Sequence, residues 1–261
     1  NKVRLTHQLI ENHLNNNSYL DEKKLIQNKY EITLPLREVR NSLKLNREDH
    51  IANADLLDLM RRVRCFGINL ARLDIRQEAD RHTKLLNELF RKKYNIKYNS
   101  LSEKEKIKLL NKLIKEKNYF VDRIKITNKE NKEVWNTFKQ ISKTPHECLG
   151  AYVISMTSTA SDILSVYFLQ IQAKIKNFLR VVPLFETLDD LKNANSVMKN
   201  LFKLSWYRKM TSAKQEVMIG YSDSSKDAGK LSASWHQYKL QEELRGLAKK
   251  YKFDLVFFHG R

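Results

Sequence analysis

Short apolar runs of strand length recur along the chain, and each is followed by a polar or charged residue and then by a segment with helical spacing. Four of the five runs lie in the second half of the sequence. The runs are Ile68–Ile75, Ala151–Met156, Val181–Phe185, Val217–Tyr221 and Leu255–Phe258. The second, third and fourth runs are followed by helical segments that begin near Ser161, Thr187 and Lys226. Strands that alternate with helices are typical of βαβ units, so the pattern predicts a parallel sheet.

A β/α barrel and an open doubly wound sheet both contain such units. The open dinucleotide-binding sheet carries a Gly-rich GxGxxG turn, and this sequence has none. We therefore favour part of a barrel, although periodicity alone does not exclude the open sheet. Before the run at Ala151, apolar residues recur mainly at three- and four-residue spacing, which predicts helices. The expected fold class is α/β with predominant helix: a partial (β/α)8 TIM-type barrel with many additional helices.

The length of 261 residues suits one large domain or two ordinary ones. We expect a helical segment over residues 1–63 and the central part of the barrel over residues 64–261. A Lys-rich helical insertion interrupts the latter at about residues 84–143. Within it, Ser102 with Glu105 forms the start of a capping box, and Ile107 to Ile114 carries an apolar stripe.

The formal net charge of +19 raises the question of a nucleic-acid partner. The insertion holds 17 Lys and Arg but 7 Asp and Glu, so about half of the excess lies there. No helix-turn-helix, zinc-finger or RNA-binding motif accompanies the charge, so we expect a solvated surface and no nucleic-acid ligand. Cys65 and Cys148 lack metal-ligand spacing, and no apolar run is long enough to span a membrane. We expect a cytoplasmic protein.

Ionisable residues stand at the ends of the apolar runs. They are Arg76, Glu186, Asp223, Lys226, His259 and Arg261. The carboxyl ends of parallel barrel strands meet on one face, where barrel enzymes do their chemistry. Two carboxylates there suit a hard divalent cation, and two guanidinium groups suit a phosphate or carboxylate. The pattern predicts phosphoryl chemistry on a small anionic substrate.

Each of these residues also has a purely structural interpretation. Arg76 shares a strand face with Arg72 and Asp74 and could belong to an internal ion-pair ladder. Glu186 could cap the helix that follows it, because acidic residues favour helix N-termini. Asp223 could be an ordinary turn residue, and His259 a structural histidine with satisfied hydrogen bonds. The functional interpretation depends on recurrence at four strand ends.

Around these residues the sequence resembles the phosphoenolpyruvate carboxylase family. Five ordered motifs carry the resemblance: Leu73–Glu78 with Arg81–Thr83, Ala151–Met156, Pro183–Leu191, Met218–Gly229 and Phe258–Arg261. Residues 1–63 and 84–143 match the family only loosely. Ala160 stands where the family more often has Pro, and Ser225 where it has Ala or Gly.

The resemblance implies an eight-stranded β/α barrel, of which this chain would hold strands three to seven, in a homotetramer. It implies a lyase that adds bicarbonate to phosphoenolpyruvate, giving oxaloacetate and phosphate, and so replenishes the tricarboxylic acid cycle. Glu186 and Asp223 would ligate Mg²⁺ or Mn²⁺. Arg76 and Arg261 would hold the phosphate of the substrate, and Lys226 and His259 would act around bicarbonate and phosphate.

Two other interpretations stay open. One is a basic helical nucleic-acid-binding or scaffold protein without catalysis, whose strand-end residues are structural. The other is a degenerate gene remnant that keeps the motifs without the activity. The His-Pro-Thr-Glu and Gly-Asp-Arg-Asp-Gly-Asn segments of the family's first two strands do not occur in this sequence, nor does the Gly-rich loop that follows Arg261 in the family.

We therefore predict that the 261-residue chain by itself has no measurable carboxylase activity. Open strand edges also expose unpaired backbone groups that favour aggregation. The measurement is oxaloacetate formation by the purified chain, coupled to malate dehydrogenase. Sustained, bicarbonate-dependent turnover would contradict the prediction.

Overall fold

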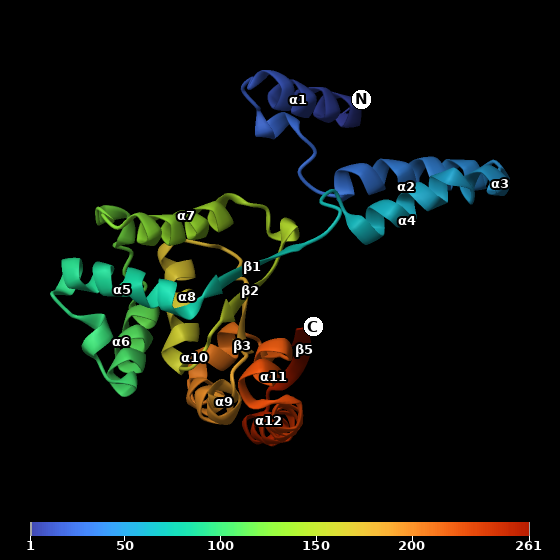
Figure 1. Cartoon of the computed structure of the whole chain (residues 1–261). Helices are drawn as coiled ribbons and strands as arrows, with labels where there is room; N and C mark the ends of the chain where they lie inside the picture. Colours follow the sequence, from blue (N-terminus) through green and yellow to red (C-terminus); the bar gives the residue numbers. More distant parts are fainter. Residues whose placement is uncertain (1, 261) are drawn as a thin grey trace. The chain divides into compact units, whose positions relative to one another are not determined.

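A computed structural model describes residues 2–260 of the chain, including every side chain in that range except that of Glu22. The chain divides into two compact units, residues 1–72 and residues 73–261. The division lies close to the expected boundary between a helical segment and the barrel part. Figure 1 shows both units and labels most of their helices and strands.

The first unit is helical. Its elements are α1 (Lys2–Asn16), a 3-10 turn at Glu22–Lys24, α2 (Tyr30–Leu45), α3 (Asp49–Ala52) and α4 (Asp55–Phe66). Helix α2 packs along α4, and the Arg40 guanidinium donates to the Ala52 carbonyl at 3.2 Å and to Asn53 Oδ1 at 2.7 Å. Among the described side chains of this unit only Ala52 is buried, so its apolar stripes remain largely open to solvent.

The second unit contains a parallel sheet whose strands pair in sequence order. The strands are β1 (Leu73–Glu78), β2 (Leu149–Ser155), β3 (Arg180–Phe185), β4 (Lys214–Gly220) and β5 (Asp254–Gly260). An open doubly wound sheet reverses its strand order at a switch point, whereas this order never reverses. The helix-rich α/β class is confirmed, and the sheet is consistent with part of a β/α barrel.

Helices connect the strands. Between β1 and β2 lie α5 (Ala79–Tyr94), α6 (Glu103–Glu116) and α7 (Lys129–Lys143), with 3-10 turns at Tyr98–Ser100, Val121–Arg123 and His146–Cys148. Later connections contain α8 (Ala160–Gln172), α9 (Leu188–Phe202), α10 (Ser205–Met210), α11 (Ser222–Ala228) and α12 (Lys230–Tyr251). Among residues 2–260, no helix is long and apolar enough to cross a membrane.

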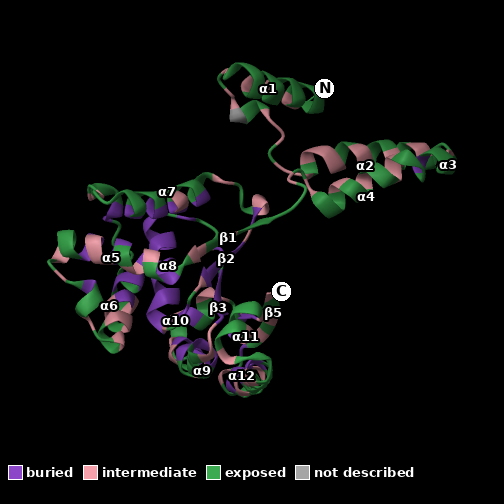
Figure 2. Ribbon diagram, in the orientation of Figure 1, coloured by how far each residue is buried: buried purple, intermediate pink, exposed green. Residues whose placement is uncertain are grey.

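The main core lies between the helices and one face of the sheet, where Figure 2 shows most of the buried residues. Every residue of α8 is buried, and the helix is mainly apolar. The other face of the sheet carries a small cluster of Ala151, Val153, Val182 and Leu184, with Met218 packed against it. Because this cluster contains only strand residues, the helices cover one face of the sheet, as they do in a barrel.

The first expected strand, Ile68–Ile75, is wrong in its position. Residues 67–72 form the link between α4 and β1, where Gly67 and Leu70 have positive φ angles of 63° and 61°. Strand β1 begins at Leu73 and continues to Glu78, because its backbone stays paired with β2 through Arg76, Gln77 and Glu78. Arg76 therefore lies within the strand and not after it.

The Lys-rich segment also contributes apolar residues to the main core. The expected capping box at Ser102 and Glu105 is confirmed at the start of α6. Helices α5, α6 and α7 each bury an apolar stripe in the main core, and Phe90 packs edge-on against Phe168 of α8 with ring centroids 5.5 Å apart. The lysines occupy the opposite, exposed faces.

Glu88 of α5 holds the segment before α7 in place. Its carboxylate accepts from Lys92 Nζ (2.6 Å), Asn131 Nδ2 (2.7 Å) and the backbone N–H (2.7 Å) and hydroxyl (2.9 Å) of Thr127. Burial alone would raise the pKa of Glu88, but these hydrogen bonds outweigh it and lower the pKa to about 2. The ionised form is thus favoured by folding.

We predict that Glu88→Gln destabilises the second unit by about 2 kcal/mol at pH 7. Because the folded pKa is depressed, this contribution is complete above about pH 5 and is lost as the pH falls toward 2. Urea unfolding at several pH values measures it, with the exposed Glu116→Gln as control. A wild-type to Glu88→Gln difference that does not shrink in acid would contradict the assignment.

Candidate functional site

The candidate site lies at the carboxyl ends of the strands. Arg76 lies in β1, Glu186 directly follows β3, Asp223 and Lys226 lie on α11 after β4, and His259 lies in β5. Asp223 belongs to the first turn of a short helix, and the helix expected near Lys226 begins at Ser222. Arg261, the sixth predicted residue, lies outside the described residues.

Arg76 and Glu186 form the central contact of this group. The guanidinium Nη2 lies 2.8 Å from Glu186 Oε1, although the residues are 110 positions apart in the sequence. The Glu186 side chain is 8% exposed and that of Arg76 is 56% exposed. A buried carboxylate is therefore neutralised by a guanidinium that still presents donors to solvent.

Burial raises the pKa of Glu186 above its ordinary value, while the charge of Arg76 acts in the opposite direction and that of Asp223 raises it further. Asp223 follows the end of β4, which pairs with β3 directly before Glu186, so both carboxylates belong to the same end of the sheet. The ideal Cβ of an alanine at position 220 would lie 3.2 Å from the Glu186 Cα and Cγ atoms, so Gly220 lets the end of β4 pack directly against Glu186.

Lys226 and His259 make other contacts. Lys226 Nζ pairs with Asp223 Oδ1 of the same helix at 3.5 Å. His259 Nδ1 lies 2.6 Å from the Tyr221 hydroxyl. Among residues 2–260, no hydrogen bond or ion pair joins either residue directly to Arg76 or Glu186.

The structural alternatives give mixed results. No ladder forms among Arg72, Asp74 and Arg76, because Asp74 Oδ1 accepts the Ala151 N–H at 2.6 Å and Arg76 pairs with Glu186. His259 is exposed, and its Nδ1 lies within hydrogen-bond distance of the Tyr221 hydroxyl, so its structural interpretation stays open. Glu186 does not cap α9; Thr187 does, since its side chain accepts from the Asp190 N–H at 3.2 Å.

Glu186 and Asp223 are the two carboxylates that the sequence predicts as metal ligands. No cluster of three or more His, Cys, Asp or Glu side chains suited to a metal occurs within residues 2–260. The pair of Glu186 and Asp223 nevertheless fits Mg²⁺, which prefers oxygen ligands and usually keeps several waters. The buried carboxylate with a like charge beside it is also a place where added positive charge is favourable.

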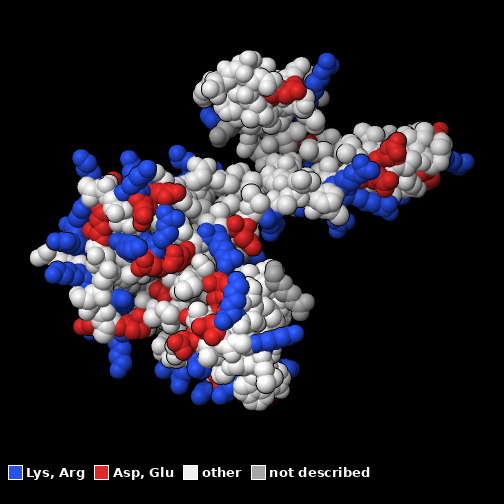
Figure 3. Space-filling view, viewed as in Figure 1, with Lys and Arg blue, Asp and Glu red and all other residues white. Residues whose placement is uncertain are grey.

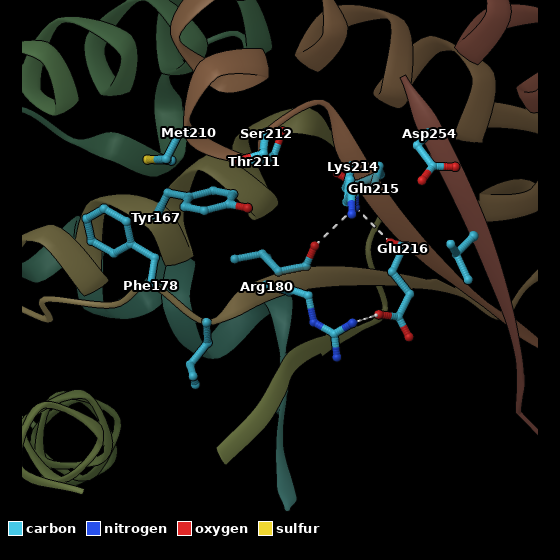
Figure 4. Close-up of a pocket in the computed structure, with 13 residues that line it drawn as sticks. Tyr167, Phe178, Arg180, Met210, Thr211, Ser212, Lys214, Gln215, Glu216 and Asp254 are labelled. Carbon is cyan, nitrogen blue, oxygen red and sulfur yellow. Dashed lines mark hydrogen bonds and ion pairs between the residues drawn. The ribbon is translucent and has the colours of Figure 1, made fainter. Parts of the chain in front are cut away.

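A separate cavity of about 480 Å³ lies at the opposite ends of the strands. It is lined at the amino ends of β3, β4 and β5 by residues that include Arg180, Glu216 and Asp254 (Figure 4). Arg180 pairs with Glu216 at 2.8 Å, and the Gln215 amide donates to the Val181 carbonyl at 3.1 Å. Because these polar groups satisfy one another, we assign this end of the sheet to stability.

Sequence reasoning assigned no role to several polar residues around the site. Asp190 Oδ2 accepts the Thr187 N–H at 3.0 Å, and Asp227 Oδ2 accepts the Leu188 N–H at 2.9 Å. Gln237 is buried on the stripe of α12 that also holds Ala233 and Leu240. A polar residue on an apolar helical stripe was the one sequence signal that pointed to it.

We predict that Thr187→Ala speeds hydrogen exchange in the first turn of α9 about fivefold, which corresponds to a cap worth about 1 kcal/mol. Glu186→Gln leaves that exchange unchanged, because its carboxylate takes no part in the cap. Peptide-resolved exchange of residues 187–194 measures both. An equal effect of the two substitutions would return the capping role to Glu186.

Comparisons with known proteins identify the family of the chain. Residues 1–261 match the sequence model of the phosphoenolpyruvate carboxylase family. The chain is 46% identical over 237 residues to the phosphoenolpyruvate carboxylases of Escherichia coli strain K12 / DH10B and Shigella boydii serotype 18. These alignments cover 91% of this chain and 27% of each relative, so the chain spans about a quarter of their length. The chain belongs to the phosphoenolpyruvate carboxylase family.

Proposed function

We propose that this chain supplies part of the active site of an enzyme that carboxylates phosphoenolpyruvate with bicarbonate to give oxaloacetate and phosphate. The observation that carries the proposal is the Arg76–Glu186 pair, with Asp223 at the same end of the parallel sheet, on residues from β1 and from the carboxyl ends of β3 and β4. Membership of the family supports it. Neither the family nor the relatives favour a basic nucleic-acid-binding protein.

The surface charge agrees with this preference. On the face of the second unit seen in Figure 3, Asp and Glu side chains lie among the Lys and Arg side chains, and no continuous basic patch forms there. A polyanion gains affinity mainly where cations cluster. The charge excess therefore does not supply an alternative function.

Glu186 and Asp223 would hold Mg²⁺ or Mn²⁺ in the proposed site. When bound, such a cation supplies positive charge against the negative charge that develops on the substrate. Arg76, whose side chain is 56% exposed, would bind the substrate phosphate with the N–H donors that do not contact Glu186. Its contact with Glu186 would orient the guanidinium before the substrate arrives.

Lys226 of α11 and His259 of β5 would complete the proposed site at the carboxyl ends of the strands. Lys226 is 79% exposed and can reach an anionic ligand as a mobile point charge. His259, oriented by the Tyr221 hydroxyl, can hold or transfer a proton at Nε2. Arg261 is proposed as a second phosphate-binding residue on the strength of the sequence resemblance alone.

The proposed reaction begins with transfer of the phosphoryl group and ends with formation of a carbon–carbon bond. Bicarbonate oxygen attacks phosphorus, the bond between phosphorus and the enol oxygen breaks, and carboxyphosphate and an enolate result. Carboxyphosphate releases CO₂ and phosphate, and the enolate carbon bonds to CO₂ to give oxaloacetate. The cations of the site neutralise the transferring phosphoryl group, as expected for this class of reaction.

Further parts of the proposal concern the whole protein. We propose that β1 to β5 are the third to seventh strands of an eight-stranded TIM-type barrel, and that residues 1–63 and 84–143 are helical additions to it. We also propose a homotetramer that acts in the cytoplasm, as a lyase that replenishes the tricarboxylic acid cycle. The sequential strand order and the helices on one face of the sheet support the barrel.

A chimaera tests the function. This chain replaces the matching segment of the Escherichia coli relative, and oxaloacetate formation is followed by coupling to malate dehydrogenase. We predict bicarbonate-dependent turnover that Glu186→Gln and Asp223→Asn each lower at least hundredfold in kcat/KM, because one oxygen ligand of the cation is lost. Glu242→Gln, an exposed substitution on α12, serves as the matched control.

Retention of activity within threefold in the Glu186→Gln or Asp223→Asn chimaera would contradict the proposed site. A folded chimaera without turnover would contradict the proposed function of this chain.

A further inference from the structure

Helix α11 carries two of the proposed site residues, yet it is only seven residues long. A helix of two turns is not stable in water by itself, because nucleation costs more than so few hydrogen bonds return. Asp223 and Lys226 are both largely exposed and do not anchor it. The position of α11 must therefore come from contacts made by its other residues, and it packs against α9 and α12 (Figure 1).

The first anchor is a buried polar pair. Ser224 of α11 is fully buried, and its hydroxyl donates to the Gly220 carbonyl at 2.8 Å. Gln237 of α12 is 4% exposed, and its amide donates to Ser224 Oγ at 2.8 Å and to the Gly220 carbonyl at 3.1 Å. Buried polar groups are costly unless paired, so this arrangement specifies one position of α11 between the end of β4 and α12.

The second anchor joins α11 to the turn that carries Glu186. Asp227 Oδ2 accepts the N–H of Leu188 at 2.9 Å. Leu188 is the first residue of α9, and its N–H is one of the amides that a helix N-terminus leaves without an internal partner. Asp190 holds the preceding Thr187 N–H, so Asp227 fixes the other side of the same turn.

Together these contacts determine the position of Asp223 relative to Glu186, the other proposed metal ligand. Gly220 packs against Glu186, Asp223 follows Gly220 by three residues, and Ser224 and Asp227 fix the helix on which Asp223 lies. We propose that Ser224, Asp227 and Gln237 form a clamp of positioning residues that holds Asp223 opposite Glu186. The clamp acts through Asp223 and not on the substrate, and the proposal rests on the proposed function of Glu186 and Asp223.

Two properties of the purified 261-residue chain test the clamp. Hydrogen exchange of residues 221–229, measured without metal, reports the order of α11. Mn²⁺ titration followed by electron paramagnetic resonance reports whether the two carboxylates face each other. The variants are Asp227→Ala and Asp227→Asn, with Asp189→Ala as the matched control, because Asp189 is an exposed acid on the first turn of α9.

We expect Asp227→Ala to speed exchange in α11 and to raise the Kd for Mn²⁺ at least fivefold. Asp227→Asn keeps an oxygen that accepts the Leu188 N–H, so it should stay within twofold of wild type in both measurements. If Asp227 acted through its charge, for instance as a further metal ligand, Asn would fail as Ala does. That result, or unchanged exchange in Asp227→Ala, would overturn the clamp.

Gln237→Leu tests the buried anchor independently. It should also speed exchange in α11 and raise the Kd for Mn²⁺. Asp227 is on the surface side of α11, so its variants keep the proposal testable even if Gln237→Leu lowers the yield of folded protein. Glu186→Gln separates the two hypotheses: it should abolish Mn²⁺ binding and leave exchange in α11 unchanged. Wild-type protein that binds no Mn²⁺ would count against the proposed site, while the exchange data would still decide on the clamp.

Discussion

Parallel pairing of the five strands is the constraint on which the rest of the second unit depends. Parallel neighbours require a crossover between successive strands, and here each crossover contains at least one helix. The helices pack on one face of the sheet and form the main core with it. The same pairing brings residues from distant parts of the sequence to one edge, so that Arg76 meets Glu186 across 110 positions.

The charges at that edge are balanced before any ligand binds. Arg76 neutralises Glu186, and Lys226 pairs with Asp223. In the proposed reaction these four groups have two functions. The two carboxylates bind a metal cation, and the guanidinium and ammonium groups bind the anionic substrate. The Lys226 ammonium group can turn toward a ligand at little cost, because surface ion pairs contribute little stability. The Arg76 guanidinium keeps its contact with the buried Glu186 carboxylate and offers its remaining N–H donors. Burial fixes Glu186, whereas the contacts of α11 fix Asp223.

Much of this architecture could be predicted from the sequence, because apolar strands and amphipathic helices leave local patterns. Four of the five expected strands overlap the observed ones closely, and the capping box at Ser102 is present. The first strand was displaced because Ile68 and Leu70 are apolar but lie in a turn. Asp227 could not be assigned a role from the sequence, since a hydrogen bond between helices leaves no periodic signal. Gln237 stands out only as a polar residue on an apolar helical stripe. That Thr187 and not Glu186 caps α9 depends on backbone geometry of one residue.

The proposed site requires that Glu186 and Asp223, from two separate strand ends, bind one cation beside Arg76. Crystals of the chain soaked in Mn²⁺ and measured at the manganese absorption edge would show whether they do. We expect an anomalous peak within about 2.5 Å of carboxylate oxygens of both residues, lost in Glu186→Gln crystals. Manganese bound elsewhere, with no peak between these two carboxylates, would contradict it.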